Sequence, residues 1–263
     1  MIANETDLDS TEPLLICLLG RFHVVKAGAD QPVRSGGKTA ILLSSLALRD
    51  RYHASRESLL ETLWPEAEAT RSAHSLNSLI HELRQRFGDV LAGASPVIYS
   101  AGGYELNVSA GVGVDVSHFD ALAGMAERQL RAGNSDAAVR SWRRAIALYH
   151  GEICAADDMR AIVQRERVRA LYLSLLGRLA DRYFRERDYE AALHYAIRLL
   201  SHDPCREDAH RLVMRCHVRT GERAQALRQY RVCQEILAAE FGARPEPLTN
   251  ALFDRVRLDP ADV

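Results

Sequence analysis

The sequence predicts a mainly α-helical protein with a small β component, in which a mixed N-terminal domain precedes an all-α repeat domain. Two observations support this fold class. Up to about residue 110, short β-rich runs alternate with helical patterns, whereas later Ala-, Leu- and Arg-rich segments alternate with breakers such as Gly133-Asn134 and Asp203-Pro204. The helical part also repeats itself at a step of 34 residues.

Bulk properties limit the classes of protein to which the chain can belong. Its 263 residues, 47% hydrophobic and 26% charged, are enough to form two cores. No apolar run approaches the roughly 18 residues of a membrane span, and the acidic start MIANETDLDSTEP lacks the basic and apolar regions of a signal peptide. We therefore expect a cytoplasmic protein without membrane contact, with an acidic, disordered tail over 1–13 and a short tail over 259–263.

Neither a metal site, a cofactor nor an enzymatic activity is expected. The five cysteines are scattered, odd in number and without a CxxC pair. His74 and His81 would lie about 10 Å apart along a helix, which is too far for one metal ion. The stretch GGKT at 36–39 resembles the end of a phosphate-binding loop, but Pro32 occupies the position at which that loop needs a glycine.

Residues 14–108 predict a short series of strands and helices. A β-rich run, LLICLLGRFHVV, covers 14–25, and KTAILLSSLALRDR follows with a helical pattern. The next helix starts at Ser55, whose hydroxyl can cap it, and Trp64-Pro65 closes it. The third helix, HSLNSLIHELRQRF over 74–87, is amphipathic, because its apolar residues recur at helical spacing: Leu76, Leu79, Ile80, Leu83 and Phe87.

A β-hairpin is predicted directly after these helices. In VIYSAGGYELNV, residues 97–108, two extended pieces surround Gly102-Gly103. A small sheet, a helix, a helix-turn-helix pair and a two-stranded wing form the layout of a winged helix-turn-helix over 14–108, whose second paired helix enters the major groove of DNA. The glycine-containing segment 109–116 is predicted to be a linker.

The polar face of the helix over 74–87 is the candidate DNA-binding site. Arginine can contact phosphates or guanine edges, and Asn and Ser can contact base edges. Each of these side chains could equally be an ordinary solvated surface residue, and Glu82 could accept from cytosine or pair with Arg86. The candidate residues on this face and on the wing are Arg71, His74, Ser75, Asn77, Ser78, His81, Arg84 and Ser100. Protonation of the two histidines below about pH 6.5 is a hypothesis for stronger phosphate binding.

The second half, residues 117–258, is predicted to be a helical repeat domain. RDYEAALHYAIRLLSHDP and GERAQALRQYRVCQEILAAEFG superimpose with Ala192 on Ala226, and an earlier copy carries Ala138, 54 residues before Ala192. A period of 34 with small residues at close-packing positions is typical of tetratricopeptide repeats. The unequal spacing indicates an imperfect array, and the repeats alone indicate an interaction module without naming its partner.

Motifs in both halves resemble one known family. The N-terminal ones are LLGRFHV, GGKTAILLSSLAL, LWP, SLNSLIHELRQRFG and GYEL; the C-terminal ones are DVSHFDAL, AIALYHGEI, HDPCREDAHRLVMRCHVRTGERAQALRQY and EFGARPEPLTNALF. They resemble the SARP-type antibiotic regulatory proteins, which join a response-regulator-type winged helix to a bacterial transcriptional activator domain. The resemblance implies a transcriptional activator that binds direct repeats in promoter DNA, usually as two protomers, and recruits RNA polymerase including its sigma factor.

Charge points to weak DNA affinity for one protomer. Residues 1–108 hold ten Lys and Arg against thirteen Asp and Glu, and without the tail over 1–13 the net charge is +1. His81 and Glu82 stand where related domains often carry arginines, and Glu105 lies in the wing where they carry another; Arg34 and Lys38 are candidate additions to the positive face. A homodimer on repeated half-sites, or polymerase contacts, would have to supply further affinity. The alternative is a protein-interaction module whose winged helix has lost DNA binding and whose polar face contacts a protein partner.

Overall fold

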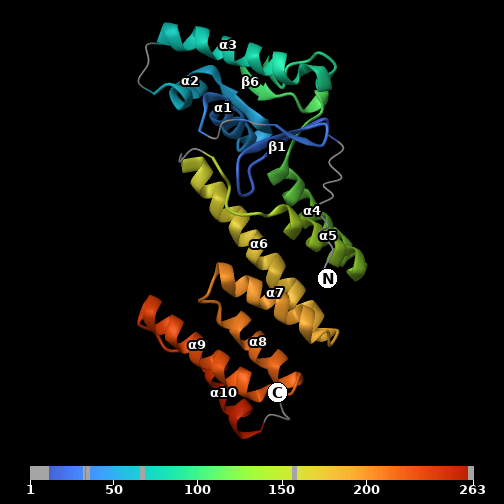
Figure 1. Cartoon of the computed structure of the whole chain (residues 1–263), viewed down its shortest axis with the longest axis vertical. Coiled ribbons are helices and arrows are strands. Elements are labelled where there is room, and N and C mark those ends of the chain that lie inside the picture. Colours follow the sequence, from blue (N-terminus) through green and yellow to red (C-terminus); the bar gives the residue numbers. More distant parts are fainter. Residues whose placement is uncertain (1–11, 32, 34–35, 66–68, 156–158, 260–263) are drawn as a thin grey trace. The chain divides into compact units, whose positions relative to one another are not determined.

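The computed structural model describes residues 12–31, 33, 36–65, 69–155 and 159–259 of the chain. These residues form two compact units, Met1–Arg169 and Ala170–Val263. The first unit holds two small sheets, five helices and the first part of a sixth, whereas helices are the regular elements among the described residues of the second (Figure 1). The expected fold class, mainly α with a small β component near the N-terminus, is confirmed.

A four-stranded sheet opens the first unit. Its strands are β1 Leu14–Cys17, β2 His23–Lys26, β3 Ala29–Gln31 and β7 Val112–Val114, in the order β3-β2-β1-β7. The strand β1 pairs antiparallel with β2 and parallel with β7. Ala27 and Gly28 both have positive φ, which is the two-residue turn that matches the twist of a hairpin. This turn joins β2 to β3. The β-rich run predicted over 14–25 is the antiparallel pair of β1 and β2.

The segment 109–116 is not a linker, and this prediction is wrong. Val112–Val114 is fully buried, and a Cβ added at Gly113 would lie 3.0 Å from the side chain of Glu12. The strand could not be predicted from the sequence because it is three residues long, contains a glycine and pairs with a strand almost a hundred residues earlier.

The predicted disordered tail over 1–13 is too long by two residues. The side chain of Glu12 bonds His118 at 3.0 Å, and Pro13 packs over Gly111. Residues 1–11 and 260–263 lie outside the described residues.

Three helices and a second sheet complete the winged helix. The helices are α1 Lys38–Ala47, α2 Arg56–Leu63 and α3 Ala69–Phe87, and the sheet, in the order β4-β6-β5, holds β4 His53–Ser55, β5 Val97–Ser100 and β6 Gly103–Leu106. Short 3-10 turns cover Asp50–Tyr52, Gly88–Leu91 and Val108–Ala110. Ser55 caps α2 by accepting from the amide of Ser58 at 3.2 Å, and α2 ends before Trp64, both as predicted. Figure 1 shows α3 lying across α1 and α2.

Two further helices, α4 Asp115–Arg131 and α5 Ser135–Leu148, belong to the same compact unit. The carboxylate of Asp115, at the start of α4, accepts from the amides of Leu18 and Leu19 at 2.8 Å each. After α5, Cys154 donates its amide to the carbonyl of Leu18 at 2.8 Å. These bonds fasten both ends of the helical hairpin to the residues that directly follow β1. The compact units accordingly divide at 169/170 within α6 Met159–Arg185, not near residue 110.

The second unit contains the repeated helices α7 Tyr189–His202, α8 Glu207–Arg219, α9 Arg223–Phe241 and α10 Pro247–Leu258. Ala192 in α7 and Ala226 in α9, which the 34-residue step places in register, are both fully buried. Ala192 packs in a cluster with Ala196 and Val213, and Ala226 packs with Met214 and Leu252. Small side chains therefore allow close approach at equivalent positions of each helix pair, as the repeat predicts.

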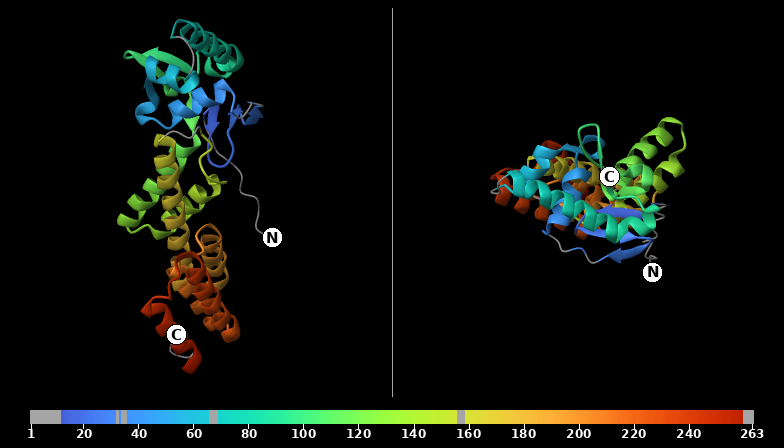
Figure 2. Two further views of the ribbon diagram at one scale, coloured as in Figure 1. Left: turned by 90° about the vertical axis from the view of Figure 1, so that its left-hand side faces the viewer. Right: turned by 90° about the horizontal axis from the view of Figure 1, so that it is seen from above.

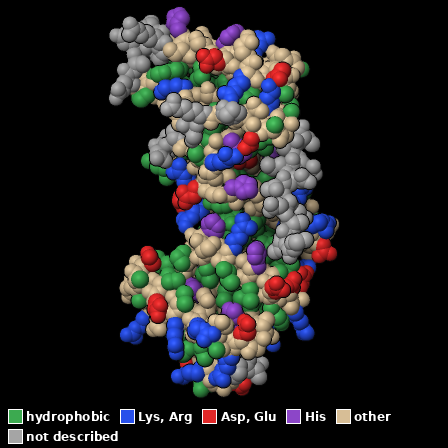
Figure 3. All heavy atoms as spheres, in the orientation of Figure 1, with side chains coloured by type: hydrophobic (Ala, Val, Ile, Leu, Met, Phe, Trp, Pro, Cys, Tyr) green, Lys and Arg blue, Asp and Glu red, His purple; other side chains and the backbone are tan. Residues whose placement is uncertain are grey.

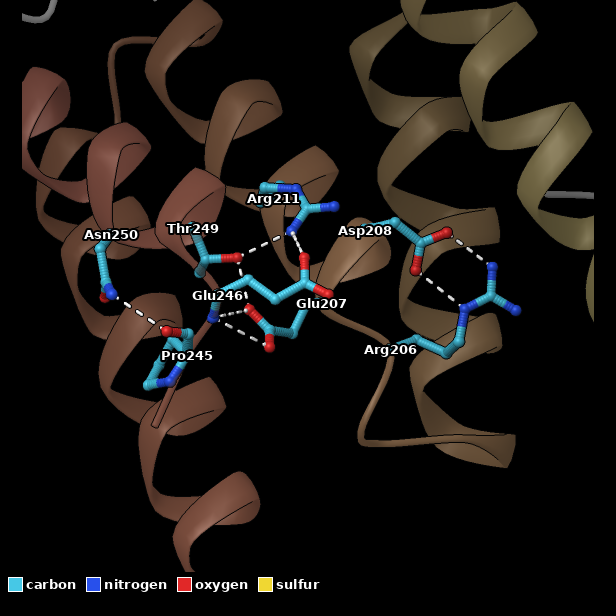
Figure 4. A network of polar contacts seen from close by, with 8 residues as sticks. All are labelled: Arg206, Glu207, Asp208, Arg211, Pro245, Glu246, Thr249 and Asn250. Atoms are coloured by element: carbon cyan, nitrogen blue, oxygen red, sulfur yellow. Dashed lines mark hydrogen bonds and ion pairs between the residues drawn. The ribbon is translucent and has the colours of Figure 1, made fainter. Parts of the chain in front are cut away.

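A polar network fastens the last helix of this unit to α8 (Figure 4). The carboxylate of Glu207 accepts from the amide of Glu246 at 2.9 and 3.1 Å and from the hydroxyl of Thr249 at 2.6 Å. Arg211 donates to the same hydroxyl at 2.8 Å and pairs with the carboxylate of Glu246 at 3.1 Å. Since Glu246 is the N-cap of α10, Glu207 satisfies an amide that the helix itself leaves unbonded.

Candidate nucleic-acid interface

The helix α3 buries one face and presents the other. Leu76, Leu79, Leu83 and Phe87 are buried and Ile80 is half-buried, so the apolar stripe read from the sequence is the core side of the helix. This stripe packs toward α1, α2 and β5. Because the apolar stripe faces the core, the polar residues between its positions lie on the outer surface of the helix.

Most of the predicted site residues lie on that outer surface. Six of them are exposed on α3: His74, Ser75, Asn77, Ser78, His81 and Arg84. Ser100 is half-buried at the end of β5, where the wing turns. Arg71 belongs to the first turns of α3, but its side chain lies outside what the structure describes, as does the whole of Arg34. The structure therefore places the six exposed candidate residues on the polar face that the helical period predicts.

One hydrogen bond joins this face to the wing. The hydroxyl of Tyr104, in β6, donates to the side-chain oxygen of Asn77 at 3.3 Å. Tyr104 is buried, and a buried tyrosine usually finds a partner for its hydroxyl. The bond restrains the side chain of Asn77, because its amide oxygen accepts from a hydroxyl whose ring is packed in the core.

Two basic side chains have intramolecular partners that shorten their reach. The guanidinium of Arg84 donates from Nε to the carbonyl of Gly93 at 3.0 Å. The ammonium of Lys38 donates to the carbonyl of Leu63 and lies 5.7 Å from the ring centroid of Trp64. Lys38 therefore caps the C-terminus of α2, and the expectation that it extends the positive DNA face finds no support in its contacts.

The electrostatic character of this region is mixed. Glu82 is exposed on α3 among the candidate residues, and Lys26 is paired with Asp89 at 2.7 Å just beyond the end of the helix. On the face that Figure 3 shows, basic, acidic and histidine side chains are interspersed over the region of α3. On that face the basic side chains are not gathered into one dense patch, which agrees with the charge count from the sequence.

The wing adds a residue that the sequence reading missed. Tyr99, in β5, pairs directly with Tyr104 of β6, and its side chain is 65% exposed. Its ring meets that of Tyr104 edge to face, with centroids 5.2 Å apart. The alternation of side chains along the strand could have indicated its position, because Tyr99 lies on the same face as Val97, which is buried in the core.

Other kinds of site are less well supported by the described part of the chain. No three His, Cys, Asp or Glu side chains gather there in a way that could hold a metal ion. None of its helices is long and apolar enough to cross a membrane. The polar face of α3 with its wing is therefore the surface to which a function is best assigned.

Comparison with known proteins gives the class. Residues 114–257, more than half of the chain, match the family model of the bacterial transcriptional activator domain. The chain therefore belongs to this family of transcriptional regulators, and its resemblance to the SARP type is confirmed.

The relatives are individual regulators of this type. Regulatory protein AfsR of Streptomyces coelicolor is 28% identical over 222 residues, which are 84% of this chain and 22% of AfsR. AfsR of Streptomyces griseus is 26% identical over 216 residues, 82% of this chain and again 22% of the relative. The chain thus spans about a fifth of the length of these curated relatives. Among solved structures, this chain is similar to Mycobacterium tuberculosis EmbR in a complex with a low-affinity phosphopeptide. The match has a TM-score of 0.70 and 22% identity, and it covers 95% of this chain and 68% of EmbR. This similarity supports the fold described above.

Proposed function

We propose that the chain is a sequence-specific DNA-binding activator whose helix α3 enters the major groove. The observation that carries the proposal is the exposed polar face of α3, fixed to the wing by the Tyr104–Asn77 hydrogen bond. Asn77, Ser78 and His81 are the candidate base contacts, and Ser75, His74, Arg84 and Arg71 are the candidate phosphate or base contacts. Ser100 is a candidate backbone contact on the wing.

The partners follow from the same proposal. Promoter DNA with direct repeats is the ligand, and RNA polymerase including its sigma factor is the protein partner. Because the winged helix carries little net positive charge, one protomer releases few counterions on binding, and a second protomer on the neighbouring half-site supplies further affinity. The proposal places the chain in the cytoplasm and assigns it no enzymatic reaction and no cofactor.

A second candidate function is supported by the charge of the site. Glu82 on α3 and Glu105 in the wing would repel phosphates, and both are compatible with a protein surface as partner. In this alternative the winged helix has lost DNA binding, and the face around Asn77 binds another protein.

Selection of bound duplexes from a random DNA pool at about 50 mM salt tests the two functions. We expect a direct repeat to be recovered by the parent chain and lost with Arg71→Ala and Arg84→Ala. Arg144→Ala, in the exposed face of α5 on the same compact unit, is the matched control and should recover the same repeat. No enrichment by a folded parent chain would contradict DNA binding and favour the protein partner.

A further inference from the structure

The wing presents an aromatic side chain on the side of the sheet that faces α3. In the antiparallel pair of β5 and β6, Tyr99 lies opposite Tyr104 and Val97 lies opposite Leu106. Opposed residues share a face of a sheet, and on this face Tyr104 reaches Asn77 of α3 while Val97 and Leu106 are buried. Tyr99 therefore continues the face of the wing that packs on α3, beyond the part that the core covers.

The geometry of Tyr99 is that of a rigid, accessible ring. Its side chain is 65% exposed, yet the edge-to-face contact with Tyr104, at 72° between the ring planes, limits its orientation. Tyr104 is itself held by its hydrogen bond to Asn77. Rigid tyrosines contribute strongly to interfaces, because they supply a large contact area at a small cost in conformational entropy.

The wing has no basic residue with which to contact phosphates. Between Gly88 and Val108 the chain contains no Lys and no Arg, while Asp89 and Glu105 are acidic. Figure 2 shows the β5–β6 hairpin, in green, projecting beside α3. A groove-bound α3 therefore brings to the adjoining DNA backbone a wing that has an exposed tyrosine and no basic side chain.

We infer that Tyr99 is a DNA-contacting residue of the wing, which packs its ring on a deoxyribose and donates its hydroxyl to a phosphate oxygen. This inference rests on the proposed function and adds a specific residue to it. A tyrosine hydroxyl is an established kind of phosphate donor. Because Tyr99 is neutral, its contact releases no counterion, so it strengthens binding without adding to the salt dependence.

Binding of a fluorescent duplex carrying the selected repeat, measured from about 50 to 200 mM salt, tests this inference. Tyr99→Thr, which keeps a strand-forming residue, is expected to weaken binding about tenfold with an unchanged slope of log K against log salt. Tyr99→Phe keeps the ring and the edge contact, and should lose about threefold through the missing hydroxyl. Arg84→Ala should instead lower the magnitude of the slope by about one.

Phe241→Ala is the control, because it removes a ring that is 67% exposed at the end of α9 in the other compact unit. It should bind as the parent chain does. If the parent chain binds and both Tyr99→Thr and Tyr99→Phe bind within about twofold of it, the role of Tyr99 is overturned while the proposed function stands. A Tyr99→Thr variant whose salt slope falls together with its affinity would also overturn the role of Tyr99. If the parent chain binds no duplex, the proposed function fails and the role of Tyr99 fails with it.

Discussion

The hydroxyl of Tyr104 donates a hydrogen bond to the side-chain oxygen of Asn77, and this 3.3 Å contact joins the wing to the outer face of α3. Tyr104 is buried and Asn77 is exposed, so a core residue of the wing fixes a surface residue of the helix. In the activator that we propose, the contact sets how α3 presents its amide to a base edge.

Tyr104→Phe removes this bond while keeping the ring. We expect the free energy of unfolding to fall by about 0.5 to 1 kcal/mol, because the bond is a single neutral one near the surface. Sequence discrimination should fall more than stability, since Asn77 gains rotamers. Urea unfolding and competition with single-base variants of the selected duplex measure the two effects. Equal discrimination by the parent and by Tyr104→Phe would show that the bond has no role in recognition.

At Gly103 the backbone of the wing lies close against β4. A Cβ at this position would overlap the carbonyl oxygen of Ala54 and would lie 2.5 Å from a ring nitrogen of His53. Gly103→Ala should therefore separate β6 from β4, destabilise the unit by about 2 kcal/mol or more, and reduce DNA binding.

The neighbouring turn supplies the matched control for Gly103→Ala. Gly102 has a φ of +84° and nothing within 4 Å of an added Cβ, and asparagine tolerates this conformation. Gly102→Asn should therefore fold and bind as the parent chain does. Thermal unfolding of the two variants checks the pair, and a Gly103→Ala protein as stable as Gly102→Asn would show that the strands separate without cost.

The buried carboxyl of Asp115 should make the stability of the protein depend on pH. Burial raises the pKa of its carboxyl to about 6, although the amides of Leu19, Leu18 and Val116 act in the opposite direction. The unfolded carboxyl titrates near its ordinary pKa, so the folded state holds the proton more tightly between the two values. The free energy of unfolding should therefore fall as the pH rises from about 4 to about 6, by an amount on the order of 2 kcal/mol.

Asp115→Asn, which cannot titrate, is the control for this pH effect. Its free energy of unfolding, measured in urea over the same pH range, should lack the decrease attributed to Asp115. A parent chain whose stability rises between pH 4 and 6 relative to Asp115→Asn would show that the amide bonds outweigh burial.

Glu207 predicts the stability of the C-terminal helix pair. Its carboxylate holds the first turn of α10 through the amide of Glu246 and the hydroxyl of Thr249. Glu207→Ala should lower the free energy of unfolding of the second unit by about 1 to 3 kcal/mol, because it leaves these groups without an acceptor. Glu235→Ala removes an exposed carboxylate from α9 and should have little effect. Limited proteolysis near residue 246 and urea unfolding compare the two variants. Equal behaviour would show that the bonds of Glu207 do not stabilise the start of α10.

The elements with a strong local period could be predicted from the sequence. The apolar stripe of α3, the Ser55 cap and the 34-residue repeat each depend on residues a few positions apart or on a similarity within the sequence itself. The strand β7 could not be predicted, because its pairing with β1 depends on a contact distant in the sequence. The positions of Lys38 and Tyr99 also depend on tertiary packing, which places one on the C-terminus of α2 and the other beside α3.

Substitution of purines in the selected repeat by 7-deazapurines tests the central claim most directly, since it removes acceptors that only the major groove presents. With α3 in that groove, substitution inside the half-sites should weaken binding about tenfold or more, and substitution in the flanking sequence should change nothing. Equal binding of the natural and the substituted half-sites would contradict a groove-bound α3.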